Sequence, residues 1–298
     1  MNKSTSFYRI MNQSIKPTDN ASYIEKTNML MDSVLKTKST MKTILVLGTG
    51  NMHDMSLVFF MRNFKQVTLS DIDIESVKEQ IKDKYNNRHV HLQEIDYLGL
   101  EQIAFFEELT KDLLLAKTSE KIQGIVNDKM KELLTYQFSS EFQEQFDSIY
   151  VSPIYTQLLY RQAESIIYSL SKVGFKKEFQ EIALSSLLQN MILVIDHFNR
   201  EIYKLLKKNG IAFIASDIFN LKDGDDFSHR VKNSIASNDV MEEIYHNYHD
   251  TYGFGLGDYG LHSISKMLKV LRSKWVIWNQ SEHQAYAVKF RAFEKIDE

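Results

Sequence analysis

Residues 42–73 constrain the fold more than any other stretch of the sequence. Residues 44–47 form a short apolar run with β-branched side chains, which predicts a strand buried on both faces. Gly48, Thr49 and Gly50 follow at once, and a turn of this composition lets the backbone approach a ligand closely. Residues 52–61 carry apolar side chains at three- and four-residue spacing, which predicts a helix.

A second strand, at residues 67–69, ends in the sequence Ser70-Asp71-Ile72-Asp73. The stretch therefore runs in the order strand, glycine turn, helix, strand and acid. A nucleoside ligand fits this order, with the turn and the start of the helix against one end of the ligand. An acid at the tip of the second strand can accept hydrogen bonds from both ribose hydroxyls.

The glycines distinguish two classes of ligand. A dinucleotide-binding turn prefers a third glycine beneath the pyrophosphate, and His53 stands at that position. A bulky residue there disfavours a pyrophosphate and is compatible with S-adenosylmethionine (SAM), which has no phosphate. The stretch resembles motif I and the acidic loop of the class I SAM-dependent methyltransferases. The alternative is a doubly wound domain whose glycine turn binds nothing.

The resemblance implies a set of SAM-binding residues. In the family, an acid after the third strand, here expected at residues 89–92, contacts the adenine amino group, and an adjacent apolar or aromatic residue packs on the base. Motif I departs from the family pattern, because Val46 and Met52 replace the usual acid and a frequent glycine. The implied cofactor-binding residues are Gly48, Thr49, Gly50, Asn51, Asp54, Asp71, Ile72, Asp96, Tyr97 and Ser152.

Two of these assignments have simple structural alternatives. Asp54, with His53 beside it, is a candidate to replace the missing motif I acid, but an acid at the start of a helix also stabilises the helix dipole by about 0.3–1 kcal/mol. Asp96 matches the adenine-binding acid in type and place, and it could equally be a solvated loop acid.

The rest of the chain supplies further strands. Residues 146–151 and 211–216 predict a fourth and a fifth strand, and 207–210 predicts the end of a helix. Residues 275–278 and 285–290 predict a terminal hairpin after a helix at 260–272. This hairpin resembles strands six and seven of the class I methyltransferase sheet. We therefore expect an α/β fold with a doubly wound seven-stranded sheet whose last strand is antiparallel, plus inserted helices.

We expect a single domain over residues 1–298, with an N-terminal helical extension at 1–40 and helical insertions at 98–145 and 155–174. A helix at residues 22–35 is predicted to cover the substrate mouth or to pack on the sheet edge. Both insertions adjoin the fourth strand. They are expected to cover the carboxyl ends of the strands and exclude water from methyl transfer. The alternative is that they form the interface of a homodimer.

Candidate catalytic residues are Tyr155 and His246. The sequence Ser152-Pro153-Ile154-Tyr155 resembles a four-residue motif of amino-methyltransferases, although Ile154 stands where proline is most constant. Tyr155 could instead cap the core. Four residues, His246, His249, Tyr252 and His262, could line a substrate cleft with a histidine as general base. We expect no metal site, because the histidine pairs lack acidic partners at a known spacing.

Composition narrows the function classes. The formal net charge is −3, which disfavours nucleic acid as a partner. The chain has no cysteine, which excludes disulfides and thiolate sites. Without a signal peptide or a membrane-length apolar run, a cytoplasmic location is expected. We expect SAM-dependent methyl transfer to a small-molecule or peptide acceptor. The alternatives are a nucleic-acid or protein amino-methyltransferase and a catalytically inactive methyltransferase-like subunit.

Overall fold

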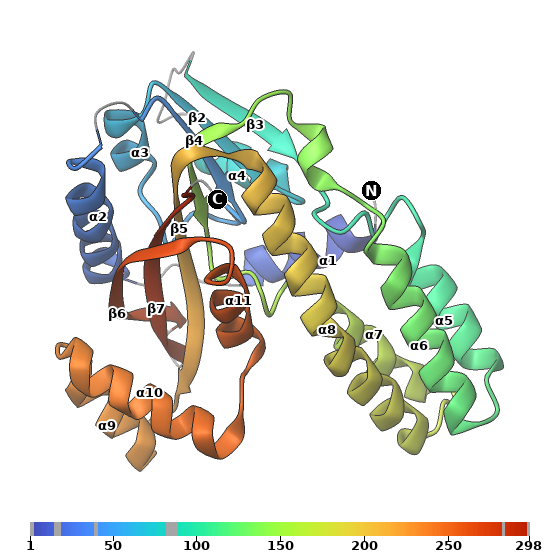
Figure 1. The fold of residues 1–298 in the computed structure, drawn as a ribbon. Coiled ribbons are helices and arrows are strands. Elements are labelled where there is room, and N and C mark those ends of the chain that lie inside the picture. The colour runs from blue at the N-terminus through green and yellow to red at the C-terminus, as the bar shows by residue number, and fades with distance from the viewer. Residues whose placement is uncertain (1–2, 15–18, 39–40, 82–88, 282–283, 297–298) are drawn as a thin grey trace.

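The computed structural model describes residues 3–14, 19–38, 41–81, 89–281 and 284–296. Seven strands form one sheet in the order β3-β2-β1-β4-β5-β7-β6 (Figure 1). The strands are β1 (Thr43–Leu47), β2 (Gln66–Asp71), β3 (Val90–Glu94), β4 (Phe146–Val151), β5 (Leu206–Leu221), β6 (Lys269–Ser281) and β7 (Gln284–Glu294). Strands β1 to β5 pair in parallel, and β7 is antiparallel to both β5 and β6. The predicted class I methyltransferase topology is confirmed.

The first strand lies at the centre of the molecule, as its sequence predicted. Its residues 44–47 are fully buried. Leu45 and Leu47 face one apolar cluster of the core, and Ile44 and Val46 face a second cluster on the opposite side of the sheet. A parallel strand covered on both faces explains why this run is apolar without alternation.

Helices cover the sheet and extend beyond it. They are α1 (Lys3–Ser14), α2 (Ala21–Leu35), α3 (Leu57–Asn63), α4 (Ile74–Ile81), α5 (Phe105–Leu115), α6 (Ser119–Leu133), α7 (Tyr160–Ser169), α8 (Lys177–Leu205), α9 (Asp226–Ser234), α10 (Asn238–Tyr252) and α11 (Leu256–Ile264). Helices α5 to α8 pack together in a bundle that projects from the sheet (Figure 1). Helix α2 packs against β6 and β7, with the Tyr23 ring 6.4 Å from that of Trp278.

The segment after the glycine turn differs from the prediction. The expected helix at 52–61 begins only at Leu57, where the Ser56 hydroxyl caps it by accepting from the Phe59 amide. Residues 50–55 form turns, and Met52 has a left-handed backbone with φ 57°. The predicted start of the helix is therefore wrong, since this turn separates the glycines from α3. That the start of the helix lies against the ligand stays a prediction.

The boundaries near the carboxyl end also differ. Residues 207–210, predicted to end a helix, lie within β5, because α8 already ends at Leu205. The helix predicted at 260–272 is α11, which ends at Ile264, and β6 occupies residues from Lys269 onward. Strands β5 and β7 stay paired from Ile211 to Leu221, so this long antiparallel ladder extends both strands past the predicted ends.

Candidate functional site

A pocket of about 60 Å³ lies at the carboxyl ends of β1 to β4. Five of the predicted cofactor residues line it: Gly48, Asp71, Ile72, Asp96 and Tyr97. The remaining lining residues are Tyr8, Leu98, Leu100, Ile154, Gln157 and Leu158. The pocket thus combines apolar walls with two carboxylates.

Gly48 is the tightest point of the pocket. Its φ of +73° is a backbone conformation that side chains disfavour, and a Cβ built on it would lie 2.3 Å from Cγ2 of Ile154. Its amide donates to the Tyr97 hydroxyl at 2.9 Å and to the Ser70 carbonyl at 3.1 Å. Only glycine fits here, which explains why the turn after β1 begins with this residue.

Asp71 joins the tip of β2 to the glycine turn. Its side chain is 7% exposed, and it accepts from the Gly50 amide at 2.8 Å and from the Asp73 amide at 2.9 Å. Burial raises the pKa of this carboxyl. A carboxylate has about four acceptor sites, so these two bonds leave capacity for further hydroxyl donors in the pocket.

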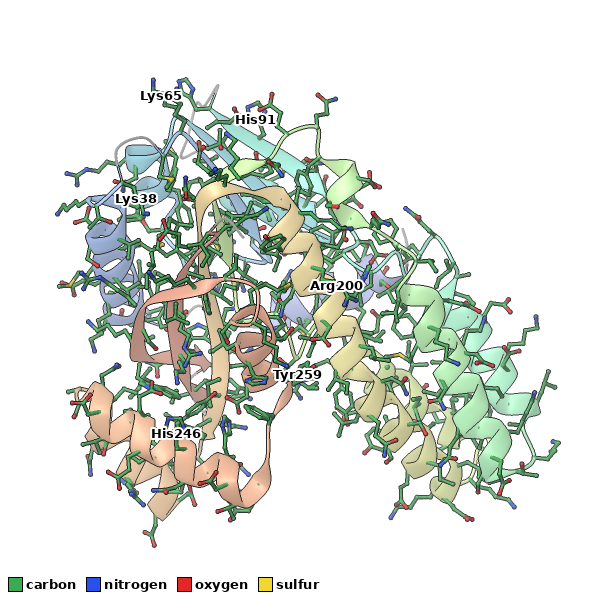
Figure 2. The ribbon with its side chains drawn as sticks, viewed as in Figure 1. Lys38, Lys65, His91, Arg200, His246 and Tyr259 are labelled. Atoms are coloured by element: carbon green, nitrogen blue, oxygen red, sulfur yellow. The ribbon has the colours of Figure 1, made fainter. Side chains whose placement is uncertain are left out.

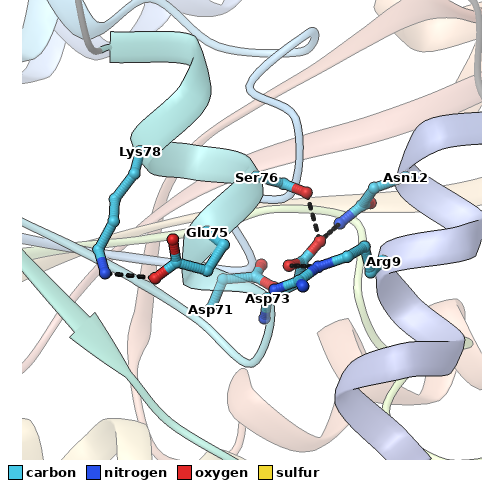
Figure 3. Close-up of polar contacts among 7 residues, drawn as sticks. All are labelled: Arg9, Asn12, Asp71, Asp73, Glu75, Ser76 and Lys78. Carbon is cyan, nitrogen blue, oxygen red and sulfur yellow. Dashed lines mark hydrogen bonds and ion pairs between the residues drawn. The ribbon is translucent and has the colours of Figure 1, made fainter. Parts of the chain in front are cut away.

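Asp73 has a different task. It is fully buried and accepts from Arg9 Nε at 3.0 Å, from Asn12 Nδ2 at 3.1 Å and from the Ser76 hydroxyl (Figure 3). Arg9 and Asn12 belong to α1. Asp73 therefore fixes the N-terminal helix, while Asp71, two residues earlier, faces the pocket.

Asp96 and Tyr97 follow β3, as predicted. Asp96 accepts from the Leu98 amide at 3.1 Å and from the Glu101 amide at 2.9 Å, and burial raises its pKa. The Tyr97 hydroxyl donates to the Ser70 carbonyl at 2.8 Å. These bonds shape the loop after β3 around the pocket, and Asp96 is half-buried rather than a fully solvated acid.

Asp54 and Ser152 are brought together outside the pocket lining. The Ser152 hydroxyl donates to Asp54 Oδ2 at 2.7 Å, and both side chains are 7% exposed. Burial raises the pKa of Asp54 to about 6. This bond links the turn after β1 to the tip of β4. Because Asp54 lies in a turn, three positions before the first residue of α3, helix-dipole stabilisation does not account for it.

Thr49 and Asn51 do not line the pocket. The Thr49 hydroxyl is buried and lies 3.3 Å from the Ser70 carbonyl, to which it donates. Asn51 stabilises its own turn by accepting from the His53 amide at 3.3 Å, and its Nδ2 lies 3.5 Å from the Asn12 carbonyl. Both residues shape the glycine turn, and their role as cofactor ligands stays a prediction.

The two candidate catalytic residues are not brought together. Tyr155 is fully buried, and its hydroxyl donates to Asn199 Oδ1 at 2.9 Å, which favours the core role. His246 is exposed on α10, where Figure 2 labels it beneath the sheet. Neither residue lines the pocket. Their assignment as catalytic residues has no support in this arrangement, because neither side chain reaches the pocket.

Helix α1 is the part of the site that the sequence analysis missed. Tyr8 lines the pocket, and its hydroxyl donates to the Gln157 carbonyl beyond β4. The Ser4 amide donates to Glu101 Oε1 at 2.7 Å, so the same helix reaches the loop after β3. Helices α5 and α7 add no residue to the lining, but the parts of the predicted insertions that precede them supply Leu98, Leu100, Gln157 and Leu158. The helical extension predicted at 1–40 includes α1, but no sequence signal placed Tyr8 in the pocket.

Two further expectations concern absent features. Within the described ranges, no group of three or more His, Cys, Asp or Glu side chains is placed to hold a metal ion. No helix in the same part of the chain has both the length and the apolar character needed to cross a membrane. The predicted location and partners of the protein stay predictions.

Known proteins share the fold but little sequence. No protein-family model matches the chain, and no curated protein is similar to it in sequence. It is similar to the solved structure of N-methyltransferase NodS from Bradyrhizobium japonicum WM9, at 12% identity and a TM-score of 0.45 over 94% of this chain and 99% of that chain. It is also similar to the solved structure of TehB from Haemophilus influenzae, at 10% identity and a TM-score of 0.42 over 90% of this chain and 62% of that chain. Such values carry no argument about function, and the strand order alone defines the fold as the class I methyltransferase type.

Proposed function

We propose that the chain binds SAM in the pocket at the tips of β1 to β4 and transfers its methyl group to a small-molecule or peptide acceptor. The observation that carries this proposal is the convergence of Gly48, Asp71 and Asp96 on one pocket, within a sheet of methyltransferase topology. Open α/β sheets bind ligands at this edge, where the strand order reverses between β1 and β4.

The residues present fit a nucleoside. The absence of a side chain at Gly48 lets backbone approach the ligand, and Asp71 retains acceptor capacity for the two ribose hydroxyls. Leu98 and Leu100 offer apolar walls for a purine beside Tyr97 and Asp96. The Asp54 carboxylate, at the turn after β1, is the candidate partner for the methionine ammonium.

Catalysis then requires little beyond alignment. SAM supplies a methyl group that is already activated by its sulfonium, so the protein must orient the acceptor and exclude water. Tyr8, Ile154 and Leu158 close the pocket from the sides of α1 and the segment after β4. The half-buried Asp96 and the buried Asp71 hold the nucleoside end, which leaves the opposite end toward the tip of β4.

Calorimetry tests this function directly. The chain should bind S-adenosylhomocysteine and SAM in the micromolar range and should not bind NAD. Binding of NAD with no binding of either SAM or its product would refute the proposal. A chain that binds the cofactor yet methylates no acceptor would be the inactive subunit that the motif I departures also allow.

A further inference from the structure

The later part of β5 and the start of α11 differ from the cofactor pocket in holding buried polar atoms without partners. Among the described residues, Ser216 Oγ, Asp217 Oδ1 and Asp258 Oδ1 are buried and lack a hydrogen-bond partner. Ser216 is fully buried and Asp258 is only 3% exposed. Buried polar atoms are nearly always satisfied in folded proteins, so three orphaned oxygens in one region indicate a missing ligand or water.

Two of these oxygens, those of Ser216 and Asp217, lie beside the same glycine. A Cβ built on Gly257 would lie 2.6 Å from Ser216 Oγ and 3.5 Å from Asp217 Oδ1. Gly257 is in the first turn of α11, directly before Asp258. The carboxyl of Asp258 is close enough to raise the pKa of Asp217. The end of β5 and the start of α11 thus bring two carboxyls and a hydroxyl together.

This group adjoins the proposed cofactor pocket. Thr156 Oγ1 lies 3.4 Å from Asp217 Oδ2, and Thr156 belongs to the segment after β4. The neighbouring residues Ile154 and Gln157 line the cofactor pocket. A ligand held by Asp217 would therefore lie across this segment from the cofactor, where a methyl acceptor belongs.

An aromatic wall continues from the acids. His249 Nε2 lies 2.9 Å from Asp258 Oδ2, and its ring centroid is 4.4 Å from that of Phe254. Phe254 is 52% exposed. Acids beside exposed aromatic rings are the surroundings that stabilise an organic cation. Residues 245–260, with the sequence YHNYHDTYGFGLGDYG, supply this wall and Asp258.

We propose that the acceptor is an amine, held in its protonated form by Asp217 and Asp258, which rests on the proposed methyltransferase function. Ionised carboxylates only accept hydrogen bonds, so their free oxygens require a ligand that donates several, and an ammonium group donates up to three. A metal ion fits less well, because no set of three ligating side chains converges in the described part of the chain.

Of the basic side chains near these acids, His249 already lies 2.9 Å from Asp258 Oδ2. The guanidinium of Arg161 lowers the pKa of Asp217, yet no ion pair within 4.0 Å joins these two described residues. Lys289 is paired with Glu242 at 2.5 Å. Among the described residues, the Oδ1 atoms of the two acids are left without a hydrogen-bond partner.

The proton balance also fits. A protonated amine must lose one proton before its nitrogen can attack. The carboxylate of Asp217 takes that proton and passes it to water. The nitrogen then bonds to the methyl carbon as the carbon–sulfur bond breaks, and the electron pair of that bond stays on sulfur.

Matched probes test the proposal by calorimetry on the full chain saturated with S-adenosylhomocysteine. 2-Phenylethylamine and n-hexylamine are charged, whereas 2-phenylethanol and 1-hexanol are neutral and of nearly the same shape. At least one amine should bind ten-fold or more tightly than its alcohol. Equal binding within both pairs, or no binding of either amine, would overturn the amine assignment.

Variants locate the binding group. Asp217→Asn and Asp258→Asn should each weaken amine binding at least ten-fold and leave S-adenosylhomocysteine affinity within two-fold. Glu243→Gln, at an exposed acid on α10, is the control and should change neither. If Asp258→Asn fails to fold, Asp217→Asn alone decides, and wild-type amine binding in it would overturn the proposal. Failure of the methyltransferase function itself would instead show as lost S-adenosylhomocysteine binding in the unmodified chain.

Discussion

The two halves of the strand edge are built in opposite ways. At the tips of β1 to β3, Asp71, Asp96 and Tyr97 each have protein partners that fix their positions. In the later part of β5 and at the start of α11, among the described residues, Asp217 and Asp258 each keep an oxygen without a partner. One side is preorganised by its own backbone, and the other is left to be completed by a ligand.

This difference separates affinity from selectivity. A cofactor site that is preformed needs little ordering on binding, so its binding free energy is not spent on arranging loops. Unpartnered buried carboxylates are costly in the free protein and reward a ligand that pairs with them, which discriminates against ligands that cannot. We therefore expect changes at the tips of β1 to β3 to weaken cofactor binding strongly. Changes at Asp217 or Asp258 should alter properties that depend on charge.

The largest expected effect is from Gly48→Ala. The new methyl group would meet Ile154 at 2.3 Å and would occupy a φ of +73°, so the turn must move out of the pocket. S-adenosylhomocysteine affinity should fall by about 100-fold or more by the arithmetic of roughly 1.4 kcal/mol per ten-fold change.

Gly124→Ala is the matched control. It lies in α6, and a Cβ there meets nothing within 4 Å. It should stabilise the protein by about 0.5–1 kcal/mol and leave binding unchanged, since alanine favours helices. Unaltered cofactor affinity in Gly48→Ala would mean that the first side of the comparison is not preformed around this turn.

A smaller effect should separate Asp71 from Asp73. Asp71→Ala removes the candidate ribose acceptor, and hydrogen bonds to charged groups contribute roughly 1.5–3 kcal/mol each. Asp73→Ala frees the contacts to Arg9, Asn12 and Ser76 but removes no group from the pocket lining. Calorimetry should therefore rank Asp71→Ala as the weaker binder of S-adenosylhomocysteine. The reverse order would mean that Asp73, and not Asp71, is the ribose acceptor.

The smallest effect concerns the other side and is one of pH. Burial raises the pKa of Asp217 from 3.8 to about 7. The native protein therefore holds this proton more tightly than the unfolded chain, so wild-type stability falls as the pH rises through this window. Asp217→Asn removes the penalty on the charged form. Its stability relative to wild type should increase between about pH 4 and pH 7 and then level off.

Urea unfolding at pH 4 and pH 8 measures this difference. A gain on the order of 1–2 kcal/mol is expected, after allowance for the partial exposure of the side chain. A difference that is equal at both pH values would show that burial does not raise the pKa of Asp217. The contrast between the two groups of residues would then not hold for Asp217.

Sequence patterns identified the parts of the fold that rest on local signals. The apolar run of β1 and the glycines after it required no tertiary information, and the terminal hairpin was evident from its two apolar segments. The end of β5 was not predictable, because its extension to Leu221 is stabilised by pairing with β7 rather than by its own residues. Local signals at Lys207 to Gly210 are those of a helix end, and the sheet overrides them.

The same division holds in the candidate site. Gly48, Asp71 and Asp96 could be placed because each follows a predicted strand, and carboxyl ends of parallel strands share one edge. Tyr8 could not, since its place depends on distant partners. The unpaired oxygens at Asp217 and Asp258 were also invisible in the sequence, because an absent partner is a property of packing alone.

Helix α1 has a consequence for the rate at which ligands enter and leave. Among its described residues, Tyr8 is the one buried hydrophobic side chain, and the helix is held mainly by polar contacts to Asp73, Glu101, Gln157 and Gln162. Segments with few buried apolar contacts open locally at a low free-energy cost, without global unfolding. Because α1 contributes to the wall of the pocket, its opening should set the residence time of a ligand bound there. The amide protons of α1 should exchange faster than those of the central strands.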